Sequence, residues 1–242
     1  MDYNWNWNVF WDFAPGESSS YLHWLVTGTS WTLATTLAAF ILAFVIGGLV
    51  GTLRTSTLRP LVWLGNLYTE VFRNIPLLVQ MFICFFVVPE LLPVSMGDYL
   101  KQDLPYPSFF SAVVALTLFT SAKLSELFKA GIESVAAGQR GAALALGLRP
   151  TQMYMQVLLP QALRVVFPPL TSEALNTLKN SSVALTIGLM ELTAQARNVS
   201  EYSFNTFEAF TAATVIYVVI SLLVTFVMGR IERSLALRGA TR

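Results

Sequence analysis

The chain has 242 residues, of which 55% are hydrophobic and only 12% charged, and its mean hydropathy is +0.59. This composition indicates an integral membrane protein. The formal net charge of +1 argues against nucleic acid as a partner, and one Cys and one His can form neither a disulfide framework nor a Cys/His metal site.

Residues 1–27 precede the first long apolar run and are rich in tryptophan, with Trp5, Trp7 and Trp11 close together. Indole rings favour the headgroup layer, so we predict a segment that lies at the membrane interface. Residues 1–20 have no basic start and no uninterrupted apolar stretch, so we do not expect a cleaved signal peptide. His23 has no evident catalytic partner and is interpreted as an interfacial residue.

The next residues form a run without charge that is longer than the roughly 20 apolar residues a helix needs to cross a membrane. Four further apolar stretches follow, and the alternating pattern of barrel strands is absent. We therefore predict an all-α integral membrane protein with five transmembrane helices. The predicted spans are 28–53, 75–88 with a backward extension through 63–71, 108–127, 165–189 and 204–229.

Small residues and prolines give these spans some detail. Gly47 and Gly51 match the small-xxx-small pattern of close helix packing. We interpret them as a packing face within the chain, with a contact between two membrane chains as the alternative. Pro76, Pro168 and Pro169 are expected to kink their helices.

Lys and Arg residues collect in three regions, which the positive-inside rule places in the cytoplasm. With five spans this predicts the N-terminus outside and the C-terminus inside, with residues 234–242 as a cytoplasmic basic tail. Asp2 and Glu17 then belong to the outer face. The cytoplasmic charges are Arg54 and Arg59, then Lys129, Arg140 and Arg149, then Arg230, Arg233, Arg238 and Arg242.

The polar insert at residues 129–160 interrupts the apolar chain. Glycines and prolines predict three short helices, at 132–137, at 139–146 and from Pro150 to an interruption at Pro160. Ala142, Ala143 and Leu146 then share one side with little bulk, where a partner surface can approach the backbone. The alternative is an ordinary loop folded against its own spans.

The sequence also lacks the G-x-x-x-x-G-K-[ST] phosphate loop, so ATP-driven transport would need a separate ATPase. The run G-A-A-x-x-x-G at 141–147, followed by V-x-L-P at 157–160, resembles the EAA loop of ABC importer permeases. The surrounding E-V-F-R-N-I-P-L-L-V-Q at 70–80 resembles the polar amino acid permease subfamily. N-W-N-W at 4–7 and V-P-E-L-L-P at 88–93 look most like its glutamate/aspartate branch.

This resemblance implies an ABC transporter type-1 transmembrane domain at 28–233, with residues 129–160 as the loop that docks on the ATPase. Gly141 replaces the glutamate that names the EAA motif. We therefore expect docking to depend on shape and on Arg140 or Glu133. The residues that the resemblance assigns to ATPase coupling are Glu133, Arg140, Gly141, Ala142, Ala143, Leu146, Gly147 and Pro160.

The resemblance also implies the setting and the partners. The chain is expected in a bacterial inner membrane, as a non-catalytic subunit that holds neither metal nor cofactor. ATP and magnesium would bind to two partner ATP-binding subunits. A second permease subunit, identical or a paralogue, and a periplasmic amino-acid-binding protein would complete the importer, with membrane lipid around it.

Charged residues within the predicted spans are candidates for the substrate pathway, because burying them is expensive. Glu70 and Arg73 are three residues apart, as are Lys123 and Glu126, so each pair can neutralise itself on one helix face. We interpret Glu70 and Arg73 as a structural or gating ion pair. A fixed cation at Lys123 would suit an anionic substrate.

The Lys-Asn pair at 179–180 also favours an anionic substrate. Related permeases have Lys-Asp there, so Asn180 removes one negative charge that would repel such a substrate. Glu173 opposes this interpretation unless a lysine neutralises it. Paired structural charges remain the alternative for each residue. The pathway candidates are Lys123, Glu126, Glu173, Asn176, Lys179 and Asn180.

Three alternatives to an acidic amino acid importer stay open. The same machinery would serve for glutamine or other polar amino acids. A secondary transporter or channel would explain the spans and the buried charges but needs no docking loop. A membrane-embedded enzyme is disfavoured, because no cluster of His, Asp or Cys suggests an active site.

Overall fold

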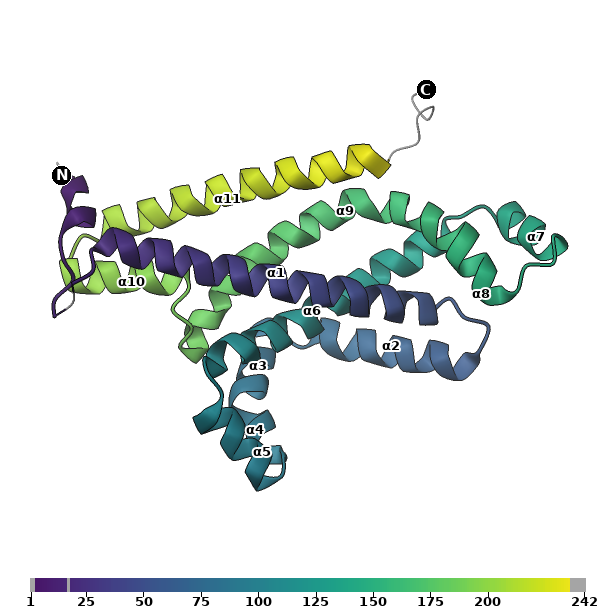
Figure 1. The fold of residues 1–242 in the computed structure, drawn as a ribbon, viewed down its shortest axis with the longest axis horizontal. Coiled ribbons are helices and arrows are strands. Elements are labelled where there is room, and N and C mark those ends of the chain that lie inside the picture. Colours follow the sequence, from purple (N-terminus) through teal and green to yellow (C-terminus); the bar gives the residue numbers. More distant parts are fainter. Residues whose placement is uncertain (1–2, 17, 236–242) are drawn as a thin grey trace. The chain divides into compact units, whose positions relative to one another are not determined.

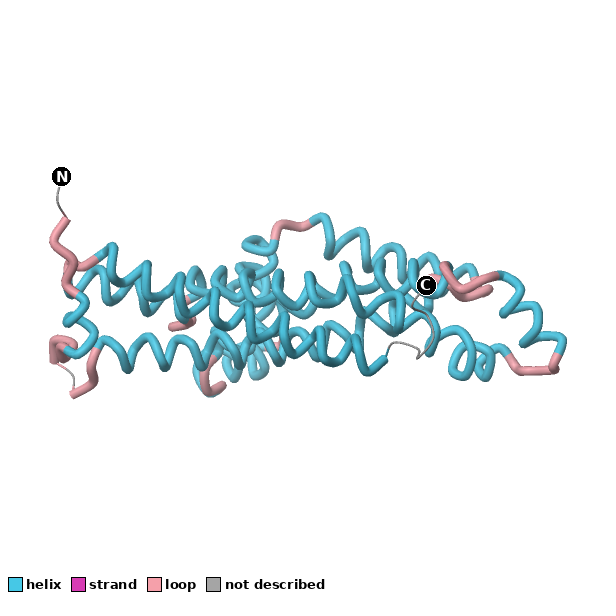
Figure 2. The backbone as a smooth tube through the Cα atoms, turned by 90° about the horizontal axis from the view of Figure 1, so that it is seen from above, coloured by secondary structure: helices cyan, strands magenta, loops and turns pink. Residues whose placement is uncertain are grey.

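The computed structural model describes residues 3–16 and 18–235 of the chain. The predictions for Asp2, Glu17, Arg238 and Arg242, and for most of the tail 234–242, lie outside these residues. Within them the chain is all helix and loop, with one isolated β-bridge between Phe13 and Ser20 and no strand (Figure 2). This confirms the all-α prediction.

Eleven α-helices follow one another in the described residues (Figure 1). Single 3₁₀ or π turns connect several of them, including π turns at Ile83–Val87, Tyr99–Asp103 and Tyr154–Leu158 and a 3₁₀ segment at Ser181–Ile187. The α-helices are α1 (Tyr21–Leu53), α2 (Arg59–Asn74), α3 (Leu77–Phe82), α4 (Val88–Leu91), α5 (Val94–Asp98), α6 (Pro107–Glu133), α7 (Ala137–Ala145), α8 (Pro150–Met153), α9 (Leu159–Asn180), α10 (Leu192–Ser203) and α11 (Thr206–Leu235).

Three of these helices, α1, α6 and α11, are long and apolar enough to cross a membrane. The count rises to four if α2 and the helix from Leu77 to Leu91 form one broken span, with a bend of 101° between them. The bend lies at Ile75 and Pro76, where the proline was expected to kink the chain. The five-span count and the orientation stay predictions.

The fourth predicted span, 165–189, is not one continuous α-helix. The α-helix α9 ends at Asn180, and a 3₁₀ segment continues to Ile187. Pro168 and Pro169 lie inside α9, which continues past both. Pro160 does not end the helix either, because the π turn at Tyr154–Leu158 leads directly into α9 and Pro160 is the second residue of α9.

The chain divides into two compact units. The first consists of Met1–Ala39, Leu77–Leu116 and Thr177–Leu223, and the second of Phe40–Pro76, Thr117–Asn176 and Val224–Arg242. In the first unit, Val9, Leu25, Leu192 and Val199 belong to a core that joins the N-terminal segment to α1, α10 and α11.

The N-terminal segment of the first unit is held on α11. The buried carboxylate of Glu208 accepts hydrogen bonds from Tyr3 Oη at 2.6 Å and from the backbone N–H of Asn6 at 2.7 Å. Trp5 and Trp7 stack with their planes parallel, and both are about half exposed. The segment therefore has a fixed conformation with its indole rings outward, and its position at a membrane interface stays a prediction.

In the second unit, α1 packs closely on α6 through its glycines. A methyl group added at Gly47 would lie 2.7 Å from Cβ of Leu124, and one added at Gly51 would lie 2.6 Å from Cβ of Phe128. Both distances are too short for real carbon atoms, so only glycine permits this approach. The predicted packing face within the chain is confirmed.

Candidate functional site

Five polar residues of the second unit meet on α6. Arg54, directly after α1, is buried, and its guanidinium donates to Glu126 Oε1 at 3.0 Å, Ser125 Oγ at 3.1 Å and Asn66 Oδ1 at 2.8 Å. Arg73 Nη1, near the end of α2, reaches the same Glu126 oxygen at 3.4 Å. We call these five residues the Arg54–Glu126 cluster. It connects the ends of α1 and α2 to the interior of α6.

Hydroxyl groups extend this contact between α2 and α6. Tyr68 Oη lies 2.7 Å from Ser121 Oγ, and Thr69 Oγ1 lies 2.7 Å from Ser125 Oγ. Thr69, Ser121 and Ser125 are buried, so each hydrogen bond satisfies groups that have lost water. The two helices are therefore joined by side-chain hydrogen bonds as well as by the cluster.

The structure corrects the predicted pairing of Glu70 with Arg73. Arg73 pairs with Glu126, and Glu70 is exposed and forms no ion pair with any residue that the structure describes. Tertiary packing explains this pairing, because Arg54 holds the Glu126 carboxylate at a position that Arg73, near the end of α2, can reach. A gating role for Arg73 stays a prediction.

The pairing of Lys123 with Glu126 is corrected in the same way. Both ion pairs of Glu126 are with Arg54 and Arg73. Lys123 is half-buried, and its Nζ lies 4.4 Å from the centroid of the Phe119 ring, one helical turn before it. Neutralisation of Glu126 therefore leaves Lys123 as a separate cation.

The candidates on α9 fall into both compact units. Glu173 and Asn176 belong to the second unit and are half-buried, and Asn176 Nδ2 donates to Glu173 Oε1 at 3.3 Å. Lys179, which is exposed, and Asn180, which is half-buried, belong to the first unit. The structure thus connects Glu173 with Asn176.

The polar insert folds into two short helices, α7 and α8, which lie side by side next to the start of α9 (Figure 1). The predicted first helix at 132–137 is wrong, because α6 continues to Glu133 and the chain then breaks before α7. The second helix is confirmed. This helix ends at Ala145, and Gly147 two residues later has a φ of +75°, the left-handed conformation that glycine permits, while Leu148 N donates to Ala143 O.

The insert has an inner and an outer face. Its inner face includes Ala143, which is 3% exposed and packs with Ile132, Met153, Leu158 and Ala162. The outer face carries the remaining predicted coupling residues on α7 and after it. Gly141, Ala142, Leu146 and Gly147 are exposed there, Arg140 is half-buried, and Glu133 and Pro160, on α6 and α9, are exposed as well.

Two predictions for the insert are thereby refined. Ala143 does not share an accessible face with Ala142 and Leu146, because its position on the helix points it into the chain's own core. The alternative of a loop folded against its own spans holds for the inner face only. Leu146 is 81% exposed, so the outer face presents an apolar side chain that the described residues do not bury.

Sequence reasoning missed the link between this insert and α1. Tyr154, in the π turn after α8, donates its hydroxyl to the backbone carbonyl of Thr55 at 2.6 Å. Thr55 directly follows Arg54 of the Arg54–Glu126 cluster. No spacing in the sequence predicts this contact, because 99 residues separate its two partners.

Sequence reasoning assigned no role to Glu191, which is fully buried in the first unit. Its carboxylate caps α10 by accepting from the N–H groups of Thr193 and Ala194, and Tyr217 Oη donates to it at 2.9 Å. Burial raises the pKa of this carboxyl, although the hydrogen bonds favour the charged form. The missed signal is its place directly before an amphipathic helix, where a carboxylate can cap free N–H groups.

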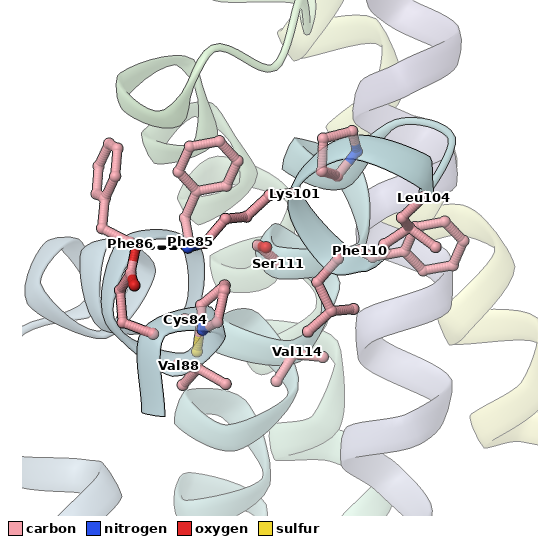
Figure 3. A pocket seen from close by; sticks show the side chains of 13 residues that line it. Cys84, Phe85, Phe86, Val88, Lys101, Leu104, Phe110, Ser111 and Val114 are labelled. Atoms are coloured by element: carbon pink, nitrogen blue, oxygen red, sulfur yellow. Dashed lines mark hydrogen bonds and ion pairs between the residues drawn. The ribbon is translucent and has the colours of Figure 1, made fainter. Parts of the chain in front are cut away.

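A cavity of about 350 Å³ lies in the first unit, between the α3–α4 region, the π turn at Tyr99–Asp103 and the start of α6 (Figure 3). Its walls are mainly apolar, with Phe85, Phe110 and Val114 among them. The charged groups at its edge, Lys101 and Glu90, neutralise each other at 2.5 Å. This cavity offers no free charge to a zwitterionic amino acid, and none of the predicted pathway residues lines it.

Comparison with known families matches residues 41–237 to the binding-protein-dependent transport system inner membrane component. The chain is 45% identical to the glutamate/aspartate import permease protein GltJ of Escherichia coli O6:H1, over 99% of this chain and 98% of the relative. It is 31% identical to the glutamate/aspartate import permease protein GltK of the same organism, over 89% of this chain and 95% of the relative.

Among solved structures, the chain is similar to one described as an amino acid ABC transporter with histidines. The TM-score is 0.73 at 28% sequence identity, over 88% of this chain and 95% of the other. The similarity therefore extends over nearly all of both chains.

Proposed function

The chain belongs to the family of binding-protein-dependent transport system inner membrane components, and we propose that it is the permease subunit of an ATP-driven importer for glutamate and aspartate. The observation that carries the substrate assignment is the 45% identity to GltJ over almost the full length of both chains. The N-terminal segment with its paired tryptophans is part of that matched length. The chain itself does not hydrolyse ATP.

The proposed location is a bacterial inner membrane, with five spans, the N-terminus outside and the insert inside. A second permease subunit would provide the other half of the pathway wall. The resemblance to both GltJ and GltK, two differently named permeases of one organism, supports a paralogue in this role. A periplasmic binding protein would deliver the amino acid, and two ATP-binding subunits would hold the ATP and magnesium.

The outer face of the insert is the proposed contact with the ATP-binding subunits. It offers exposed Ala142 and Leu146 and, at Gly141, no side chain, while the inner face fixes its shape. At Gly141 nothing lies within 4 Å of the place where a Cβ would stand. A partner surface can therefore approach the backbone closely, which supports docking by shape rather than by a carboxylate at this position.

The Arg54–Glu126 cluster offers a physical route from docking to the pathway. The insert begins where α6 ends, and Glu126 lies two helical turns before that end. Tyr154 attaches the other end of the insert to the residue after Arg54. Movement of the insert by ATP binding would thus act on both sides of the cluster and shift α1 and α2 relative to α6, as alternating access requires.

Reconstitution tests this function. The chain is placed in proteoliposomes with its second permease, its ATP-binding subunits and the binding protein, and uptake of labelled glutamate is measured with and without ATP inside. We expect ATP-dependent uptake that aspartate competes and that arginine does not. Competition by glutamine alone would instead assign a neutral substrate, and sustained uptake against a gradient without the ATPases would contradict an importer of this class.

A further inference from the structure

Lys123 is a half-buried cation of α6 without a counter-ion. Among residues 3–16 and 18–235, four ion pairs occur, and none of them includes Lys123. Its ammonium lies over an aromatic face instead, with Nζ 4.4 Å from the centroid of the Phe119 ring. A lysine in a predicted membrane span usually pairs with a carboxylate or reaches water, so this arrangement calls for an explanation.

The nearest carboxylate along the helix is already engaged. Glu126 follows Lys123 by three residues, but its Oε1 accepts from both Arg54 and Arg73. Arg54, Arg73 and Lys123 are therefore three cations near one carboxylate, that of Glu126. Arg54 is buried and fully engaged with its three partners, so the positive charge that remains available belongs to Arg73 and Lys123.

The other carboxylates of the second unit do not neutralise Lys123. Glu70 and Glu133 are exposed, Glu173 accepts from Asn176, and Glu232 on α11 takes part in none of the four ion pairs. No carboxylate that the structure describes lies within 4 Å of the Lys123 ammonium. The positive charge of Lys123 is thus held on a packed helix, where an anion from outside the chain can pair with it.

The ring of Phe119 explains how the cation is kept in place. An ammonium above an aromatic face is attracted by the ring quadrupole, which offsets part of its lost hydration without cancelling its charge. A carboxylate would hold the lysine more strongly but would neutralise it. The aromatic contact therefore positions the ammonium and keeps it available for a negatively charged ligand.

We propose that Lys123 is a specificity-determining residue that binds the carboxylate of an acidic amino acid during its passage, with Phe119 as the positioning residue beneath the ammonium. This inference rests on the proposed function and adds the residue that distinguishes anionic from neutral substrates. The side-chain carboxylate is the group that glutamate and aspartate have and glutamine lacks. Lys123 pairs with it while Arg54 and Arg73 hold Glu126 away.

The test uses the complete reconstituted importer with saturating binding protein and glutamate. Uptake and ATP hydrolysis are measured in the same proteoliposomes for wild type, Lys123→Gln, Lys123→Arg and the matched control Lys101→Gln. Lys101 belongs to the first unit and pairs with Glu90. Lys123→Gln should lower glutamate uptake at least about ten-fold, the usual consequence of losing a charged hydrogen bond. ATP hydrolysis should stay within about two-fold, and Lys123→Arg should keep most of the uptake.

Several results would overturn the assignment of Lys123. These are wild-type uptake by Lys123→Gln, a parallel fall in uptake and ATP hydrolysis, an equal loss in Lys123→Arg, or failure of Lys123→Gln to assemble. The last two would show that the residue is needed for packing rather than for the cargo. A wild-type complex without ATP-dependent uptake of glutamate or aspartate would instead contradict the proposed function itself.

Discussion

Replacing Glu126 with glutamine should destabilise the chain strongly. The Arg54 side chain is only 6% exposed, so the substitution leaves a buried guanidinium with Ser125 and Asn66 but without a negative charge. Breaking a buried ion pair by removing one partner costs about 3–5 kcal/mol. The Glu126 side chain is 38% exposed, so solvent reduces the effect and we expect about 3 kcal/mol.

Replacing Arg73 with glutamine should have a much smaller effect. Its side chain is 55% exposed, and its ion pair with Glu126 is long, at 3.4 Å. Such exposed pairs contribute about 0–1 kcal/mol. Glu70→Gln serves as a matched control, because Glu70 is exposed and forms no ion pair among the described residues, and it should change stability by less than about 0.5 kcal/mol.

The assay is thermal unfolding of the full-length chain in detergent. At about 2–4 °C per kcal/mol, Glu126→Gln should lower Tm by about 6–12 °C and Arg73→Gln by at most about 4 °C. The apolar double variant Arg54→Met with Glu126→Leu should recover most of the loss, since it leaves no buried charge unpaired. A Tm for Glu126→Gln equal to that of Glu70→Gln would refute the reasoning, as would equal losses for Glu126→Gln and Arg73→Gln.

Three further predictions concern the packing of α1 and the insert. Ala143→Asp should lower Tm because it buries an unpaired charge. Ala142→Asp, on the exposed face, should leave Tm unchanged and reduce uptake per ATP hydrolysed. Equal Tm values for the two variants would contradict the assignment of an inner and an outer face. Tyr154→Phe should cost about 1 kcal/mol in thermal unfolding through its lost hydrogen bond, and no change would mean the bond contributes nothing. Gly51→Ala should destabilise by about 1–3 kcal/mol, whereas Gly141→Ala, in open space, should not destabilise.

Local features of this fold could be read from the sequence because short-range physics determines them. The charge-free run at 28–53 corresponds to the greater part of α1, and the predicted second helix of the insert corresponds to α7. Gly147 was expected to end that helix, and it lies two residues after the helix end at Ala145, with positive φ. In each case the residues that decide the structure are neighbours in the chain.

The partners of charged side chains could not be read in this way. Spacing of three residues places Lys123 and Glu126 on one helix face, but it does not say what lies opposite that face. Arg54 and Arg73 reach Glu126 from 72 and 53 residues away, because α1 and α2 end beside α6. A partner from another helix changes the charge balance of every residue nearby.

Arg54 shows the consequence for topology as well as for function. The positive-inside rule counts Arg54 as a solvated charge, yet its side chain is buried and forms an ion pair with Glu126. Arg59, the exposed first residue of α2, is the solvated charge after α1 that can act on orientation. The ion pair with Arg54 balances the charge of Glu126. Because Glu126 pairs with both arginines, Lys123 has no carboxylate partner among the described residues, and an anionic cargo would supply one.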